Sequence, residues 1–279
     1  MKKSVFFTAL AIGLATTAGA KEKPPLFVEA SPIKDKPTVT LDPTKGYALL
    51  RSDAAVPLYL MKVPTTADRA AYQKLRAEAL IEARGRYERK LAAYRREQPI
   101  AARTPGAAQP EKPVEPTDSN FDFTPLELLT AVGLGPLNRF AKAKELSTYL
   151  QELTPGTYRI YGFLSALPGT APVGSCFCMG SLQFEAKAGE IADLGQVITK
   201  ASGDQPEGDS SAPIDLGRAT MFARADTPVD PRLVRFTVKP AAFRPIGKLP
   251  NYFGLTITRV PAMAGIMRYE RDRIVDLTR

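Results

Sequence analysis

Glycine and proline divide most of this chain into short apolar segments. The 279 residues include 20 glycines and 25 prolines. From Asn120 onwards these residues separate stretches that are rich in β-branched, aromatic and leucine side chains. Many short strands between Gly and Pro turns are typical of an all-β sandwich or barrel. We therefore predict a mainly β protein in which residues 120–279 form the main domain, a β-sandwich or an open barrel.

One stretch departs from this pattern, and it predicts a long helical insertion over residues 64–98. Thr66 is expected to cap the helix, with Asp68 favourable near its N-terminal end, and Pro99 is expected to end it. Apolar side chains recur at steps of three or four residues, as along one side of a helix: Tyr72, Leu75, Ala79, Ala83, Tyr87, Leu91 and Tyr94. Such a helix is expected to lie in solvent, on its own body or on a partner. The alternative is a helix on a membrane surface, which the glutamates that interrupt its basic face disfavour.

Turn chemistry places the other boundaries. Residues 99–119 hold repeated prolines and read as a Pro-rich linker. Residues 44–63 carry two short strand patterns and are predicted to form a β-hairpin of the main domain. Pro155 and Gly156 fit a type II turn after a strand from about residue 145, although residues 142–153 also fit a helix. Another turn is expected at Gly189, and a final hairpin is expected to turn near residues 271–272.

The first twenty residues have the pattern of a signal peptide. A basic start is followed by a short apolar run and by small residues that end at Ala20. We expect cleavage near Ala20 and Lys21, and a periplasmic or secreted protein with an extended N-terminal arm over residues 21–43. No later stretch is long and apolar enough to predict a membrane span.

Composition excludes several kinds of function. The chain contains no histidine and no tryptophan, so Ser-His or Cys-His nucleophiles, an imidazole base and a His-ligated zinc are all excluded. No paired-acid motif indicates a carboxylate-based hydrolase. We therefore predict no enzymatic activity and no cofactor. The net charge is +9, and basic and acidic residues are mixed along the chain with no basic cluster outside one helix. We therefore expect no nucleic-acid binding but weak attraction to an anionic surface.

The two cysteines, Cys176 and Cys178, lie in the segment GSCFCMGSLQFEA. On one continuous strand from Gly174 to Ala186, both would share the apolar face with Leu182 and Phe184, and Phe177 and Met179 would take the other face. Same-face neighbours are about 6.5–7 Å apart at Cα, so a disulfide between the two cysteines requires a kink. Four possibilities remain: a structural bridge, two buried thiols, a copper(I) site with Met179, or a redox-active pair.

Two further segments carry a family resemblance. The sequence LTPGTYRIYGF resembles the turn of prealbumin-like and carboxypeptidase-regulatory-like β-sandwich modules of bacterial envelope proteins, and FEAKAGEIADLGQV is similar to their later strand pair. The resemblance covers about residues 145–197. It implies a fold with structural, adhesive or ligand-presenting roles and transfers no catalytic residue.

Together these observations predict an exported, non-catalytic envelope protein that acts by binding or by structural support. Its partner would be an envelope protein, a glycan or an anionic surface. The alternative is a periplasmic copper-binding or small-ligand-binding module that uses Cys176 and Cys178.

Overall fold

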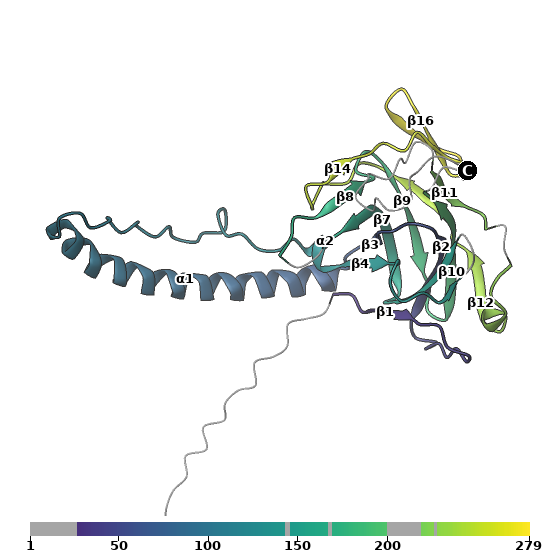
Figure 1. The fold of residues 1–279 in the computed structure, drawn as a ribbon, viewed down its shortest axis with the longest axis horizontal. Helices are drawn as coiled ribbons and strands as arrows, with labels where there is room; N and C mark the ends of the chain where they lie inside the picture. Colours follow the sequence, from purple (N-terminus) through teal and green to yellow (C-terminus); the bar gives the residue numbers. More distant parts are fainter. Residues whose placement is uncertain (1–26, 143–145, 167–168, 200–218, 226–227) are drawn as a thin grey trace, which may run out of the picture.

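The computed structural model of the chain describes residues 27–142, 146–166, 169–199, 219–225 and 228–279. The protein is mainly β, as predicted, and one long helix projects from a body of strands (Figure 1). The expected signal peptide, residues 1–20, lies outside the described residues, as does the start of the N-terminal arm. The rest of this arm contributes a short edge strand, which pairs with β6 of the first sheet.

Two large sheets make up most of the body. The first has the order β1-β6-β2-β10-β11, with β5 also beside β6 and β12 also beside β10. Its strands are β1 (Ala30–Ile33), β2 (Gly46–Ser52), β5 (Ala141–Lys142), β6 (Ser147–Leu153), β10 (Glu190–Ile198), β11 (Thr220–Ala223) and β12 (Thr237–Pro240). Most pairs are antiparallel, but β10 runs parallel to both β2 and β12.

The second sheet has the order β13-β9-β7-β3-β4, with β8 also beside β7 and β14 beside β8. Its strands are β3 (Leu58–Lys62), β4 (Ala131–Leu134), β7 (Gly156–Ser165), β8 (Val173–Cys176), β9 (Ser181–Ala186), β13 (Arg244–Ile246) and β14 (Thr256–Ile257). A third, small sheet contains β15 (Ala262–Met263), β16 (Met267–Glu270) and β17 (Arg273–Asp276). The predicted final hairpin is confirmed, since β16 pairs with β17 across Arg271 and Asp272.

The largest apolar cluster is built from both large sheets. Leu50 of β2 and Leu194 of β10 belong to it with Leu60 of β3 and Phe184 of β9, and all four are almost fully buried. Smaller clusters cover the opposite face of each sheet. The one on the first sheet includes Leu233 of the short helix η1 (Pro231–Leu233). Both faces of the central strands are therefore buried.

The expected hairpin over residues 44–63 is wrong. Both strand segments form, but β2 pairs with β6 and β10 in the first sheet, whereas β3 pairs with β4 and β7 in the second. The turns at Gly156 and Gly189 likewise pass from one sheet to the other. Gly156 has φ 148°, far from the value of about 80° that a type II turn requires, whereas Gly189 has φ 73°. Local sequence therefore located the turns but not the pairing of the strands that they join.

The segment from Gly174 to Ala186 is not one strand, which corrects the predicted faces. β8 and β9 pair with different parts of β7, and the loop at residues 177–180 separates them. This interruption shifts the alternation by one residue. Phe177 joins Leu182 and Phe184 in the main core, while Cys176 and Cys178 pack on the opposite face of the sheet.

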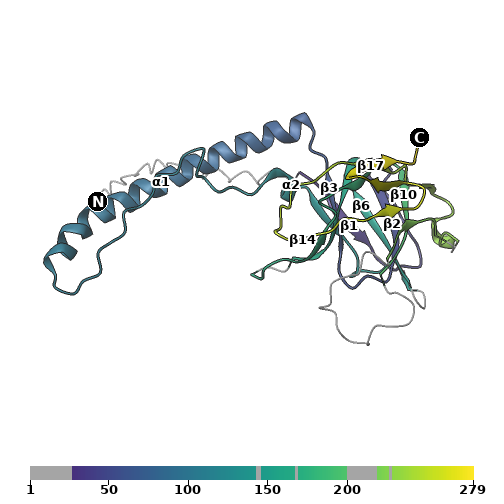
Figure 2. The same ribbon diagram turned by 90° about the horizontal axis from the view of Figure 1, so that it is seen from above.

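The predicted insertion is helical but longer than expected. Helix α1 (Thr66–Arg103) begins after its cap Thr65, one residue earlier than predicted, and it continues one turn past Pro99. Proline removes one backbone donor, and Pro99 lies on an exposed turn where water can satisfy the freed carbonyl. The linker returns beside α1 to the body, where the short helix α2 (Leu126–Leu129) precedes β4 (Figures 1 and 2).

Candidate functional site: a clamped projecting arm

The structure joins Cys176 and Cys178 in a disulfide, with their Cα atoms 5.1 Å apart. This separation is shorter than on an extended strand, because the second cysteine lies in the loop after β8 rather than in the strand. Both side chains are buried beside Leu255. The backbone N–H of Leu249 donates to the carbonyl of Cys178 at 3.0 Å, and the hydroxyl of Tyr269 donates to the carbonyl of Met179. The bridge therefore secures a loop between two strands, and it leaves no thiolate at this position.

The predicted turn residues do not contribute to a site. Pro155 and Gly156 connect β6 to β7, and Gly189 connects β9 to β10. The backbone N–H of Gly189 donates to the carbonyl of Lys45 at 2.8 Å, which ties this turn to the segment before β2. All three residues thus have structural roles in turns at the ends of interior strands.

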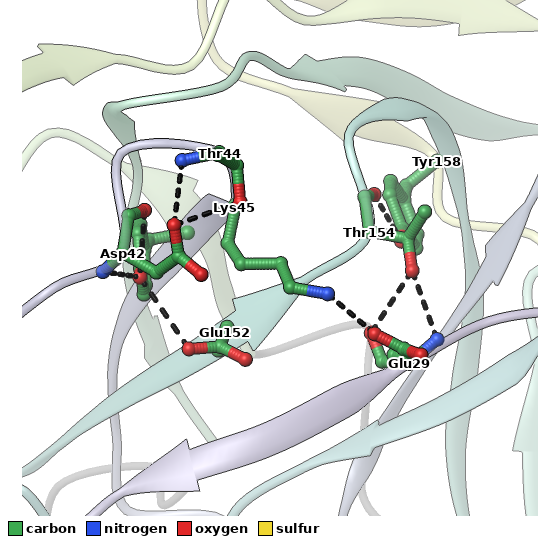
Figure 3. Close-up of polar contacts among 8 residues, drawn as sticks. Glu29, Asp42, Thr44, Lys45, Glu152, Thr154 and Tyr158 are labelled. Carbon is green, nitrogen blue, oxygen red and sulfur yellow. Dashed lines mark hydrogen bonds and ion pairs between the residues drawn. The ribbon is translucent and has the colours of Figure 1, made fainter.

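A polar cluster beside β2 and β6 brings three carboxylates together (Figure 3). Asp42 accepts hydrogen bonds from the backbone N–H of Thr44 at 2.8 Å and from its hydroxyl at 2.7 Å. These two bonds, with the charge of Lys45, lower the pKa of Asp42 although burial opposes the shift. Lys45 forms an ion pair with Glu29, which raises the pKa of its ammonium group.

Tyr47 connects the remaining carboxylate of this cluster to the N-terminal arm. Its hydroxyl accepts from the backbone N–H of Asp42 at 2.7 Å and reaches a carboxylate oxygen of Glu152 at 3.4 Å. Burial is the main reason that the pKa of Tyr47 rises to about 12. Each acidic group thus forms hydrogen bonds or an ion pair that fix the N-terminal segment to the strands. This geometry does not favour an acid–base pair.

The most distinctive feature of the molecule is the arm formed by α1 and the returning linker. At a rise of 1.5 Å per residue, the 38 residues of α1 extend about 57 Å. Both views show the arm projecting from the body, with the linker beside the helix along its length (Figures 1 and 2). The arm comprises residues 66–125, and the rest of the described chain forms the body.

The base of the arm is clamped to the body by an ion pair and a capping box. The ammonium group of Lys62 in β3, which is 5% exposed, lies 2.8 Å from the carboxylate of Asp68. Asp68 also accepts from the backbone N–H of Thr65 at 2.8 Å, and the Thr65 hydroxyl accepts from the backbone N–H of Asp68. Burial disfavours the charged carboxylate, but these bonds outweigh it and lower the pKa of Asp68. The first turn of α1 is therefore fixed to a core strand.

Aromatic contacts extend this clamp to the linker. The ring of Tyr72 packs at 6.4 Å from Phe27 and at 5.6 Å from Phe123, between centroids. Its hydroxyl donates to the carbonyl of Thr124 at 3.1 Å. Arg76 donates to the side chain and the carbonyl of Asp118 at 3.0 and 2.7 Å. Helix, linker and N-terminal segment therefore meet at one point, which sets the direction of the arm.

The linker contacts the helix with a period of three residues. Its partly buried positions are Ala107, Pro110, Pro113 and Pro116, and the residues between them are mostly exposed. A polyproline II helix has three residues per turn, and these positions have the spacing of one side of such a helix. Along α1, the apolar side chains at Tyr87, Leu91 and Tyr94 are also partly buried. The linker of the same chain thus covers the predicted apolar stripe. The three-residue spacing of its prolines is the sequence signal for this packing.

A hollow of about 350 Å³ lies beside the clamp. Its lining combines aromatic, apolar and charged side chains: Arg69, Tyr72, Gln73, Phe123, Pro125, Leu126 and Glu127. Only one carboxylate, that of Glu127, contributes to this lining, whereas glycoside hydrolysis by acid–base chemistry uses two. The hollow therefore gives no support to a carboxylate-based hydrolase.

Two further findings concern the residues that the structure describes. Within them, no group of three or more Cys, Asp or Glu side chains is arranged to hold a metal ion. None of the described helices combines the length and the hydrophobicity that a membrane span requires.

Comparisons of this chain with protein-family models, with curated proteins and with solved structures found no match.

Proposed function

We propose that this chain is an exported, non-catalytic envelope protein whose body presents the arm to a binding partner. On this proposal the body is a β-sandwich module of the prealbumin-like or carboxypeptidase-regulatory-like kind, and the arm is the contact element. The observation that carries the proposal is the clamp at the base of the arm. An arm held by the Lys62–Asp68 ion pair and by the Tyr72 contacts keeps its direction, so its far end is presented at a set distance from the body.

Export is supported by two independent features. The N-terminal residues have the pattern of a cleavable signal, and the only two cysteines are joined in a disulfide. Disulfides persist in the periplasm and outside the cell but are rare in reducing compartments. The proposed localisation predicts that the mature protein begins at Lys21, which intact-mass measurement of the protein from the periplasm or medium would test.

A binding role is favoured over catalysis by the state of the polar groups. The chain has no histidine, and the carboxylates of Asp42 and Glu29 are occupied by Thr44 and Lys45. A copper or small-ligand site at Cys176 and Cys178 would need reduced sulfur, whereas the two atoms are bonded to each other. No observation therefore favours the metal-binding alternative.

Photo-crosslinking in the native cell would test the arm as the contact element. A photoreactive phenylalanine analogue is placed at Ala92 or Arg96 on the exposed far part of α1, and at Lys36 on the body as the matched exposed control. We expect adducts from the two arm positions and few from the control position. Adducts that form only from Lys36, or equally from all three positions, would contradict the proposal.

A further inference from the structure

The charge of α1 is concentrated in its outer half. Residues 84–103 contain seven basic and two acidic side chains, whereas residues 66–83 contain three of each. The linker opposite the outer half, residues 104–114, has one Glu and one Lys, so it does not neutralise this charge. The basic residues of the outer half are Arg84, Arg86, Arg89, Lys90, Arg95, Arg96 and Arg103. The part of the arm farthest from the body is therefore the most basic part.

Most of these cations are available to a partner. All seven are exposed. Arg86 lies 3.7 Å from Glu82, and the Nε of Arg84 donates to the carbonyl of Pro116 at 3.2 Å. No carboxylate of the described chain forms an ion pair with any of the other five, so their charge is not used within the arm. These five side chains are therefore exposed to solvent and form no ion pair within the described chain.

The helical period gathers three of these arginines on one side. Arg89, Arg96 and Arg103 are seven residues apart, which places them in one row with about 10.5 Å between neighbours. The same row includes Ile100, which is 65% exposed. At 100° per residue, this row lies opposite the stripe at residues 87, 91 and 94 that the linker covers. The free side of the arm thus displays guanidinium groups around one exposed apolar side chain.

We infer that the outer half of α1 binds the anionic headgroups of a lipid bilayer, with this arginine row facing the surface. The inference rests on the proposed role of the arm as the contact element. Basic residues beside an anionic bilayer each strengthen binding by about fivefold, and a broad surface accepts cations that are spread along a rod. Because the linker occupies the apolar stripe, α1 has no free apolar face to insert. The contact is therefore peripheral, sensitive to salt and centred on Arg89, Arg96, Ile100 and Arg103.

Co-sedimentation of the purified protein with vesicles tests this inference. Vesicles of phosphatidylcholine alone are compared with vesicles that also contain phosphatidylglycerol, at low and at high salt. We expect binding only to the anionic vesicles, and weaker binding at high salt because the charges are then screened. The triple variant Arg89→Gln, Arg96→Gln, Arg103→Gln should lower the affinity on the order of 100-fold.

A second triple variant provides the matched control. Lys34→Gln, Lys248→Gln and Arg271→Gln remove three exposed cations from the body, so both triple variants have the same net charge. Far-UV circular dichroism checks that α1 stays helical in each. We expect the body variant to keep close to the original affinity. An equal loss in both variants would overturn the inference, since net charge alone would then explain the attraction.

The inference and the proposed function fail in different ways. Binding that does not depend on phosphatidylglycerol, or no vesicle binding at all, would overturn the inference that α1 binds anionic lipid headgroups. If protein adducts still form through Ala92 or Arg96 in cells, the arm remains the contact element and its partner is a protein. If the arm gives no protein adducts but binding to the anionic vesicles is lost in the arm triple variant, lipid binding stands without a protein partner.

Discussion

The body and the arm of this protein are stabilised in different ways. In the body, residues distant in sequence share one core: Leu50 of β2 and Phe184 of β9 are buried in the same cluster. In the arm, each turn of α1 meets its own neighbours and one short piece of linker. A change in the body should therefore affect folding as a whole, whereas a change in the arm should remain local.

Two glycines provide the largest contrast. Gly162 in β7 has φ 155°, and a Cβ there would overlap the backbone of Ser175 and Cys176 in β8. We expect Gly162→Ala to lower the free energy of unfolding by more than about 3 kcal/mol, because strain and overlap act together. Gly85 in α1 has no neighbour within 4 Å of an added Cβ, so Gly85→Ala should stabilise the helix by up to about 1 kcal/mol.

Chemical denaturation followed by circular dichroism measures both variants, and hydrogen exchange separates arm amides from body amides. The expected result is a large loss in the body for Gly162→Ala and slower exchange confined to the arm for Gly85→Ala. A shift of the body transition by Gly85→Ala would show that arm and body unfold as one unit, which would remove the contrast.

Leucine truncation sharpens the same comparison at a smaller scale. Leu60 of β3 is fully buried in the main core, so Leu60→Ala should destabilise the body by about 2–5 kcal/mol. Leu91 of α1 is only partly buried, and Leu91→Ala should cost less than about 1 kcal/mol. Denaturation midpoints with unchanged m-values would measure both effects. Equal losses would mean that the linker packs on α1 as tightly as the two sheets pack on each other.

The sequence predicted what depends on local chemistry. The helix follows from its apolar period, and the last hairpin follows from its turn near Arg271. Strand pairing was missed because it depends on contacts between distant segments. Nothing near Ser52 or Leu58 shows that β2 and β3 enter different sheets. Among the described residues, the interruption after Cys176 was also hidden, because alternation over residues 174–186 fits one strand as well as two.

In the arm, the sequence predicted the helix but not the contacts that hold it. Its helix was found, but the linker was interpreted only as a spacer, although Pro110, Pro113 and Pro116 repeat with the period of a polyproline II helix. The clamp was not predicted because it joins Lys62, Asp68 and the aromatic side chains around Tyr72, whose contacts arise only when the chain folds. The candidate site is therefore a product of tertiary structure, and only its charge was visible in the sequence.

The disulfide is expected to have a moderate effect on the body. Cys176 and Cys178 are two residues apart, so the bridge closes a very short loop, and loop-closure entropy assigns it about 1.6 kcal/mol. We expect Cys176→Ala with Cys178→Ala to lower the free energy of unfolding by about this amount, less than Leu60→Ala does. Denaturation of the double variant, with reduced wild-type protein as the control, measures it. A loss as large as that of Leu60→Ala would show that the loop at residues 177–180 organises the whole second sheet.

The smallest expected effect concerns Tyr47, and it depends on pH. Burial raises the pKa of Tyr47 from 10.0 to about 12 in the folded protein. A group whose folded pKa is raised contributes stability that is complete below its unfolded pKa of about 10 and is lost as pH rises toward 12. Tyr47→Phe removes the hydroxyl that contacts Asp42 and Glu152, so it should cost about 1 kcal/mol near neutral pH.

The stability advantage of the wild-type protein over Tyr47→Phe should therefore shrink above pH 10 and change sign before the pH reaches about 12. Denaturation midpoints across this range measure it, and Tyr94→Phe in α1 is the matched control, since it removes a tyrosine hydroxyl from the arm. We expect Tyr94→Phe to leave the body transition unchanged at every pH. A difference for Tyr47→Phe that stays constant through this range would mean that the pKa of Tyr47 is not raised in the folded protein. The segment holding Asp42 would then not be fixed to β2 through this hydroxyl.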